Sequence, residues 1–177
     1  MGKIIILGVI LIGLSACQPS KKQEQSSSLA EVSQDEKREV ILKDYGAEPL
    51  VINIEDYTLG NTNFRTAIWT GNLFQLTVMS IPVGGEVGLE MHGDVEQFLR
   101  IEEGRAEVLM GDSEDNLTFI RQASNDDAIF VPSGKWHNII NIGDTPLKLY
   151  SIYAKPEHPH GTVHKSKSES DAAHHEH

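Results

Sequence analysis

The chain has 177 residues, of which 39% are hydrophobic, and a formal net charge of -11. This length favours one domain, and the apolar content is sufficient for a buried core, so disorder of the whole chain is not expected. No cluster of Lys and Arg stands out beyond Lys21 and Lys22, which excludes nucleic acid as a partner because binding to phosphates needs a basic surface.

The first residues of the chain read as an export signal. Lys3 precedes an apolar run over residues 4–14, which is too short for a bilayer-spanning helix of roughly 20 residues but suits a secretory signal. The run leads into the motif Leu-Ser-Ala-Cys at residues 14–17, which resembles the bacterial lipobox. The resemblance implies a signal peptide over residues 1–16 and lipidation of Cys17, and therefore a lipoprotein anchored to a membrane of the cell envelope.

The alternative is a plain secretory signal followed by an incidental cysteine. Cys17 is the only cysteine of the chain, so an intramolecular disulfide, a cysteine nucleophile and a thiolate metal site are excluded. In a Gram-negative cell, Gln18 lacks the acidic character of a retention signal, which favours the outer membrane, facing the periplasm.

Beyond the signal, the composition changes twice. Residues 17–48 are predicted to form a lipidated and flexible tether, since residues 18–34 are rich in Ser, Gln, Lys and Glu. Residues 49–157 contain short runs of Val, Ile, Phe and Thr between turn-forming residues, a pattern typical of an all-β sandwich or barrel. The predicted strands are residues 51–54, 74–81, 106–110, 117–120, 128–131, 138–141 and 147–153. Residues 158–177 are predicted to be a C-terminal extension that is disordered and His-rich from about Lys165 onward.

Two glycine-containing motifs carry the residues best suited to chemistry. The first reads Gly-x5-Glu-x-His-x4-Gln-x6-Gly from Gly84 to Gly104, and the second reads Pro-x-Gly-x-x-His-x-x-x-Asn from Pro132 to Asn141. In these motifs the chain resembles the cupin superfamily, over roughly residues 73–153. The resemblance implies an all-β fold, the cupin jelly-roll barrel, with one metal ion inside it, and a homodimer.

A narrower likeness links the chain to a group of small bacterial cupins that is loosely called mannose-6-phosphate-isomerase-like. It is carried by Asn-Phe-Arg at residues 63–65, Trp-Thr-Gly at residues 69–71 and the segments 132–138, 146–153 and 159–165. This group has no settled activity to transfer to the chain.

The first motif departs from the usual cupin pattern at two positions. The family usually has His where this chain has Glu90, and Glu where the spacing lands on Gln97. Residues two apart in a strand share a face, so Glu90 and His92 point the same way, and Gln97 shares the face of Leu99 and Ile101. We therefore expect Gln97 to point into the barrel and Glu96 to point out, although Phe98 on the Glu96 face argues for the opposite assignment.

The predicted metal ligands are Glu90, His92, Gln97 and His137. One carboxylate, one amide oxygen and two imidazoles suit a divalent Mn, Fe, Ni or Zn ion. The alternatives are a barrel without metal and a site of different composition. For a single one of these residues, an exposed pair or a hydrogen-bonded core histidine would be the better interpretation.

Two classes of function fit such a site. The first is a metal-dependent enzyme that acts on a small oxygen-bearing molecule through Lewis-acid or O2 chemistry, as an oxidoreductase or isomerase. The second is a non-catalytic module that binds or senses a small ligand or metal at the cell envelope. An additional non-ligating group inside the barrel would favour the enzyme, and Arg65 and Tyr150 are the candidates.

The remaining histidines are weaker candidates. His158, His160 and His164 either cap the mouth of the barrel or belong to a structured surface segment, and the sequence favours the surface segment. His174, His175 and His177 are better explained by a polar tail than by metal binding.

Overall fold

The computed structural model describes residues 39–174, so the predicted signal peptide, Cys17, most of the tether and residues 175–177 lie outside the described part. The elements are α1 (Ile54–Gly60), β1 (Arg65–Thr70), β2 (Phe74–Ile81), β3 (Glu96–Glu103), β4 (Arg105–Gly111), β5 (Phe119–Ser124), β6 (Ala128–Val131), β7 (Trp136–Asn141), β8 (Leu147–Ala154), β9 (Val163–His164) and α2 (Lys167–His174). Among the described residues, no helix combines the length and the hydropathy needed to cross a membrane.

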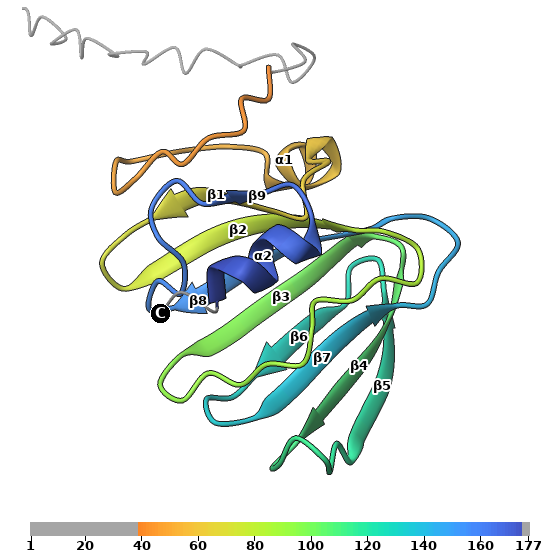
Figure 1. Cartoon of the computed structure of the whole chain (residues 1–177). Coiled ribbons are helices and arrows are strands. Elements are labelled where there is room, and N and C mark those ends of the chain that lie inside the picture. Colours follow the sequence, from red (N-terminus) through yellow and green to blue (C-terminus); the bar gives the residue numbers. More distant parts are fainter. Residues whose placement is uncertain (1–38, 175–177) are drawn as a thin grey trace, which may run out of the picture. The chain divides into compact units, whose positions relative to one another are not determined.

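The strands form two antiparallel sheets that face each other (Figure 1). A six-stranded sheet has the order β6-β3-β8-β2-β1-β9, and a three-stranded sheet has the order β5-β4-β7. Apolar side chains from both sheets form one core between them, including Met79, Leu99, Val108, Ile139 and Leu149. The all-β jelly-roll barrel predicted from the sequence is thereby confirmed.

The inner face of the six-stranded sheet changes from apolar to polar along the strands. In one row across β2, β8 and β3, Met79 pairs with Leu149 and Leu149 with Ile101. Four residues away along each strand, the corresponding row is Gln75, Tyr153 and Gln97, and all three are buried. A polar site is therefore built into one end of the barrel, and the other end is filled by the apolar core.

The outer face of β1, β2 and β8 is covered by the segment that precedes β1. Tyr57 of α1 packs with Ile68 and Val78 in a second apolar cluster. Tyr150 packs against this outer cluster, so its side chain lies on the face of the sheet away from the barrel interior. Tyr150 is therefore not the additional group inside the barrel that the sequence suggested.

The first predicted strand, residues 51–54, is wrong. Asn53 is the N-cap of α1, and its side chain accepts a hydrogen bond from the backbone N–H of Glu55 at 3.1 Å. Glu55 and Asp56 then place negative charge in the first turn, which stabilises the positive end of the helix dipole. The capping residue decides the local structure here, against the β propensity of the Val and Ile residues.

The prediction of disorder from Lys165 onward is also wrong, because residues 167–174 form α2. Ser166 Oγ accepts a hydrogen bond from the Glu169 backbone N–H, and the Glu169 carboxylate accepts one from the Lys165 backbone N–H. These contacts resemble a capping box, and the Ser-x-x-Glu spacing was its signal in the sequence. The helix is tied to the barrel through Ser170, which is buried.

Candidate metal centre

Glu90 lies on the segment between β2 and β3, which are both strands of the six-stranded sheet. This segment runs beside β7: the Glu90 backbone N–H donates to His137 O at 3.0 Å, and the His137 N–H donates to Glu90 O at 2.9 Å. The Asn138 side chain fixes the segment further, since it accepts from the Gly88 N–H at 3.1 Å and donates to Glu86 Oε2 at 2.8 Å. Glu90 and His137 are therefore direct neighbours on adjacent extended segments.

His92 is held by the turn of the second motif. The Gly134 backbone N–H donates to His92 O at 2.7 Å, and Gly134 has a φ of 76°, a left-handed conformation that favours glycine. The turn at residues 132–134 thus brings His92 of the first motif close to the start of β7.

The hydrogen bonds of the two histidines leave their Nε2 atoms facing the same place. His137, which is 1% exposed, has Nδ1 at 3.0 Å from the carbonyl oxygen of Lys135. His92 Nδ1 lies 3.2 Å from Glu157 Oε1. A carbonyl or carboxylate oxygen can only accept, so in each neutral ring Nδ1 carries the proton and Nε2 presents a lone pair.

Both Nε2 atoms face oxygen acceptors. Glu90 Oε1 lies 3.4 Å from His92 Nε2 and 3.4 Å from His137 Nε2. Gln97 donates its side-chain N–H to Ser151 Oγ at 3.0 Å, which turns its Oε1 toward His137 Nε2 at 3.0 Å. Gln97 is 3% exposed, and Glu96 is exposed. The predicted inward orientation of Gln97 and outward orientation of Glu96 are therefore confirmed.

The donor set fits a divalent cation. Four atoms with lone pairs converge: Glu90 Oε1, His92 Nε2, Gln97 Oε1 and His137 Nε2. Glu90 Oε1 and His92 Nε2 are buried and have no hydrogen-bond partner among the described residues. Acceptor atoms packed this closely repel one another unless a proton or a cation lies between them. The candidate ligand atoms of Glu90, His92 and His137 all lie within 4.8 Å of one another.

The pKa shifts at the site show the same demand for positive charge. Burial alone would raise the pKa of Glu90, but the His137 and His92 rings and the charge of Arg65 outweigh it and hold this pKa far below its ordinary value. Burial likewise opposes protonation of His92, but Glu157 and Glu90 raise the pKa of His92 to about 9. Both shifts have the same cause, which is that the cluster favours a positive charge at its centre.

Comparisons with known proteins agree with this geometry. A family model described as "Cupin domain" matches residues 77–153. The chain is 57% identical over 138 residues to the uncharacterized protein YrkC of Bacillus subtilis, covering 78% of this chain and 74% of YrkC. It is also 36% identical over 121 residues to the uncharacterized protein L612 of Acanthamoeba polyphaga mimivirus, covering 68% of this chain and 74% of L612.

The chain belongs to the cupin family.

Solved structures support the fold of this cupin. The crystal structure of BH2720 from Bacillus halodurans is similar with a TM-score of 0.73 and 55% identity, over 73% of this chain and 98% of that chain. A Klebsiella pneumoniae protein with a double-stranded β-helix domain is similar with a TM-score of 0.51 and 16% identity, over 66% of this chain and 92% of that chain.

A cavity of about 410 Å³ adjoins the candidate metal centre of the cupin. Glu90, His92 and Glu157 line one part of it, and Arg65 and Ser170 line another. Arg65 is thus the additional non-ligating group that the sequence suggested. Sequence reasoning missed Glu157, whose only signal was an acidic residue just beyond the last barrel strand.

The later histidines do not belong to the candidate metal centre, since no group of metal-binding side chains among the described residues includes them. His158 is buried and its ring packs edge-on against Tyr153 at 5.2 Å. His160 lies at the surface, with Nε2 3.5 Å from Asp44 Oδ1, and His164 of β9 pairs with Arg65 of β1.

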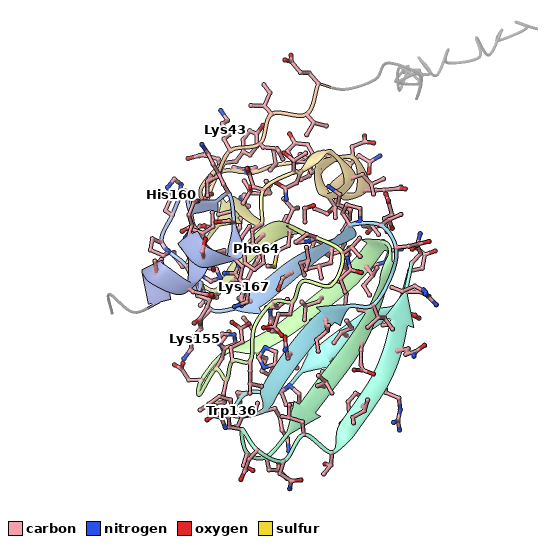
Figure 2. All side chains as sticks on the ribbon, turned by 45° about the vertical axis from the view of Figure 1, so that its right-hand side comes forward. Lys43, Phe64, Trp136, Lys155, His160 and Lys167 are labelled. Carbon is pink, nitrogen blue, oxygen red and sulfur yellow. The ribbon has the colours of Figure 1, made fainter. Side chains whose placement is uncertain are left out.

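The Trp69 ring stacks on the Phe74 ring, with 4.6 Å between the ring centroids. Figure 2 shows Trp136 at the end of the barrel away from His160.

Proposed function

We propose that this cupin binds one divalent metal ion through Glu90, His92, Gln97 and His137 and uses it on a small oxygen-bearing molecule in the adjoining cavity. The observation that carries the proposal is the convergence of Glu90 Oε1, His92 Nε2, Gln97 Oε1 and His137 Nε2, a buried cluster that favours a positive charge at its centre. Mn, Fe, Ni and Zn suit this set of oxygen and imidazole ligands. When bound, such an ion supplies Lewis acidity, or O2 activation if it is Fe or Mn.

The formal charge of the cavity supports a divalent cation. Its lining contains the acidic residues Glu86, Glu90, Glu157 and Asp171 and the basic residues Arg65 and Lys167. This balance is negative by about two charges, which one divalent ion would neutralise.

Elemental analysis of the purified full-length protein, expressed with Mn, Fe, Ni and Zn supplied, tests the site. We expect about one metal ion per chain. His137→Ala is expected to lose it, and a variant with His174, His175 and His177 replaced by Ala is expected to keep it. Metal content near zero in the wild type, or unchanged content in His137→Ala with a native circular dichroism spectrum, would contradict the proposal.

We place the metal-dependent enzyme before the non-catalytic module because Arg65, which is not a candidate ligand, is buried and lines the cavity. The second candidate, a non-catalytic module, is favoured by the contacts of two acids in the cavity: Glu86 is hydrogen-bonded to Asn138, and Glu157 contacts His92. Assays for O2 consumption and for turnover of sugar phosphates, catechols and diketones separate the two candidates. Binding of a small molecule without turnover would support the module.

We also propose that Cys17 anchors the protein to a membrane of the cell envelope by a lipid, on the basis of the lipobox resemblance alone. Cys17→Ser is expected to release the protein from the membrane fraction or to leave an uncleaved precursor. Membrane association and processing equal to those of the wild type would overturn this proposal. The homodimer remains a prediction, for which sedimentation measurements are the test.

A further inference from the structure

The guanidinium of Arg65 is a charged group of the cavity that has no carboxylate within ion-pair distance among the described residues. Arg65 is 1% exposed, and its Nη1 donates to Ser170 Oγ at 2.7 Å. Its Nε is buried without a hydrogen-bond partner among the described residues. None of the ion pairs in the described part of the chain includes Arg65.

A purely structural role accounts poorly for this arginine. Ser170 is neutral, so its hydrogen bond satisfies one donor without pairing the charge. The Phe64 ring, with its centroid 5.6 Å from the guanidinium carbon, adds only a cation–π contact. Burial of an unpaired charge is costly, and an apolar side chain of similar size would fit a packed interior at lower cost. The residue is therefore expected to be retained for something that it binds.

The position of Arg65 relative to the candidate metal ligands indicates the kind of ligand. Arg65 lines the same cavity as Glu90 and His92, so its positive charge borders the same space as the negative charge of the Glu90 carboxylate. A cation bound by Glu90 would take up that negative charge and add positive charge close to Arg65. Glu86 and Asp171 are engaged by Asn138 and Lys167, so an anionic group between the ion and Arg65 would face a positive centre on each side.

The free edge of the guanidinium suits a planar anion. Nη1 is engaged by Ser170, whereas Nε is buried and has no hydrogen-bond partner among the described residues. Arginine binds carboxylates through two parallel N–H donors, a geometry that a point charge such as lysine lacks. The volume of about 410 Å³ limits the occupant to a small molecule.

We propose that the cavity binds a small organic acid, whose carboxylate accepts hydrogen bonds from Arg65 while a second oxygen lies toward Glu90, His92 and His137. This inference rests on the proposed metal function and names its ligand class. The first turn of α2 adds Lys167 to the lining of the cavity, and Figure 2 shows this residue on the same side of the barrel as Lys155. Lys167 is ion-paired with Asp171 at 2.9 Å, so Arg65 remains the principal anion-binding group.

The experiment measures binding of glycolate and pyruvate to the metal-loaded full-length protein by calorimetry. Their neutral amides, glycolamide and pyruvamide, and inorganic phosphate are the comparison probes. Arg65→Met is expected to weaken carboxylate binding by roughly tenfold or more, because a charged hydrogen-bonding group is lost. Arg100→Met is the matched control, since Arg100 is partly exposed and paired with Glu102 and Asp126 instead of lining the cavity.

A second readout separates ligand binding from a structural role. If Arg65 serves the ligand, Arg65→Met without carboxylate should unfold at the same or a higher temperature than the wild type, because a buried unpaired charge is removed. If Arg65→Met does not fold, Arg65→Lys is tested in its place. This variant keeps the positive charge but lacks the two parallel N–H donors of arginine, so it should also bind carboxylate less tightly.

The outcomes distinguish this inference from the proposed function. Equal carboxylate affinity of wild type and the Arg65 variants, binding of the amides as tight as that of the acids, binding of phosphate alone, or no binding of any probe would overturn it. Metal content is measured on the same samples. Absence of metal with Arg65-dependent carboxylate binding would refute the metal function and support the carboxylate site.

Discussion

Glu157 and Ser151 act on the candidate metal centre through other residues. The Glu157 carboxylate lies against His92 Nδ1, and Ser151 Oγ accepts from the Gln97 amide. Each contact decides which atom of the neighbouring side chain faces the cluster. Such contacts orient ligands and typically change metal affinity by about 10–100-fold when they are removed. They make Glu157 and Ser151 positioning residues.

At Gln97, the chain offers an internal control for the proposed ligand set. Gln97→Ala removes the inward amide oxygen and is expected to reduce metal affinity by roughly tenfold. Glu96→Ala removes an exposed carboxylate from the same strand and is expected to leave the affinity within about twofold, since its charge is screened by solvent. Competition titration with a chromogenic chelator measures both constants. A larger loss in Glu96→Ala than in Gln97→Ala would exclude Gln97 from the ligand set.

The sequence could predict much of the site because strand periodicity constrains its faces. The alternation of Gln97, Leu99 and Ile101 was enough to orient Gln97. It could not identify Glu157, because the residue follows β8 in a segment with irregular backbone: Lys155, two residues earlier, has a φ of 87°. In such a segment, no period relates sequence position to direction.

Among the elements, the segment before β1 is held in place by one carboxylate. Asp44 accepts hydrogen bonds from the backbone N–H groups of Gly46, Thr70 and Gly161 and from the Thr70 hydroxyl, with distances between 2.6 and 3.0 Å. It therefore joins three parts of the chain that are distant in sequence. Burial works against ionisation, but the contacts with Thr70, Gly161, Gly46 and His160 keep the pKa of Asp44 below its ordinary value.

This carboxylate gives the fold a specific dependence on pH. Because the pKa of Asp44 is lower in the folded than in the unfolded protein, its contribution to stability is present near neutral pH and is lost as the pH falls below about 4. Asp44→Ala is expected to reduce the free energy of unfolding at pH 7 by about 2–3 kcal/mol. Urea denaturation at pH 7 and pH 3 measures the effect. The expected difference between wild type and variant is smaller at pH 3, and an equal difference at both values would contradict this account.

The strands themselves were predicted unevenly. The runs at residues 74–81 and 128–131 match β2 and β6, because they carry dense β-branched and aromatic residues between turn formers. β1 was missed, since three of its six residues are Arg or Thr, and its Arg65 and Thr66 are buried in spite of their polarity. Polar residues in a buried strand are stabilised by tertiary contacts, and the local sequence pattern carries no information about those contacts.

At the scale of the whole molecule, the candidate ligands connect the two sheets. Gln97 belongs to the six-stranded sheet, His137 to the three-stranded sheet, and Glu90 and His92 to the segment between β2 and β3. An ion held by all four would therefore have to be released before the sheets separate. Metal binding and unfolding of the barrel are linked for this reason.

Metal addition is accordingly expected to raise the melting temperature of the wild-type protein. At a free metal concentration of 100 times Kd, the gain is about 2.7 kcal/mol, which corresponds to a shift of roughly 10 °C for a domain of this size. Differential scanning calorimetry with and without EDTA measures it. The same addition to His137→Ala should cause little shift, and an equal shift in both proteins would assign the metal to another place.

The pairing of β9 with β1 and the packing of α2 have a practical consequence for anyone who shortens the chain. Domain limits taken from the family match at residues 77–153 would begin inside β2 and remove Arg65, Glu157, β9 and α2. Even a cut made only after β8 would leave β1 without its partner β9, as an open edge that invites aggregation. Fragments used for crystallisation or screening should therefore include the segment before β1 that contains Asp44 and should extend through His174.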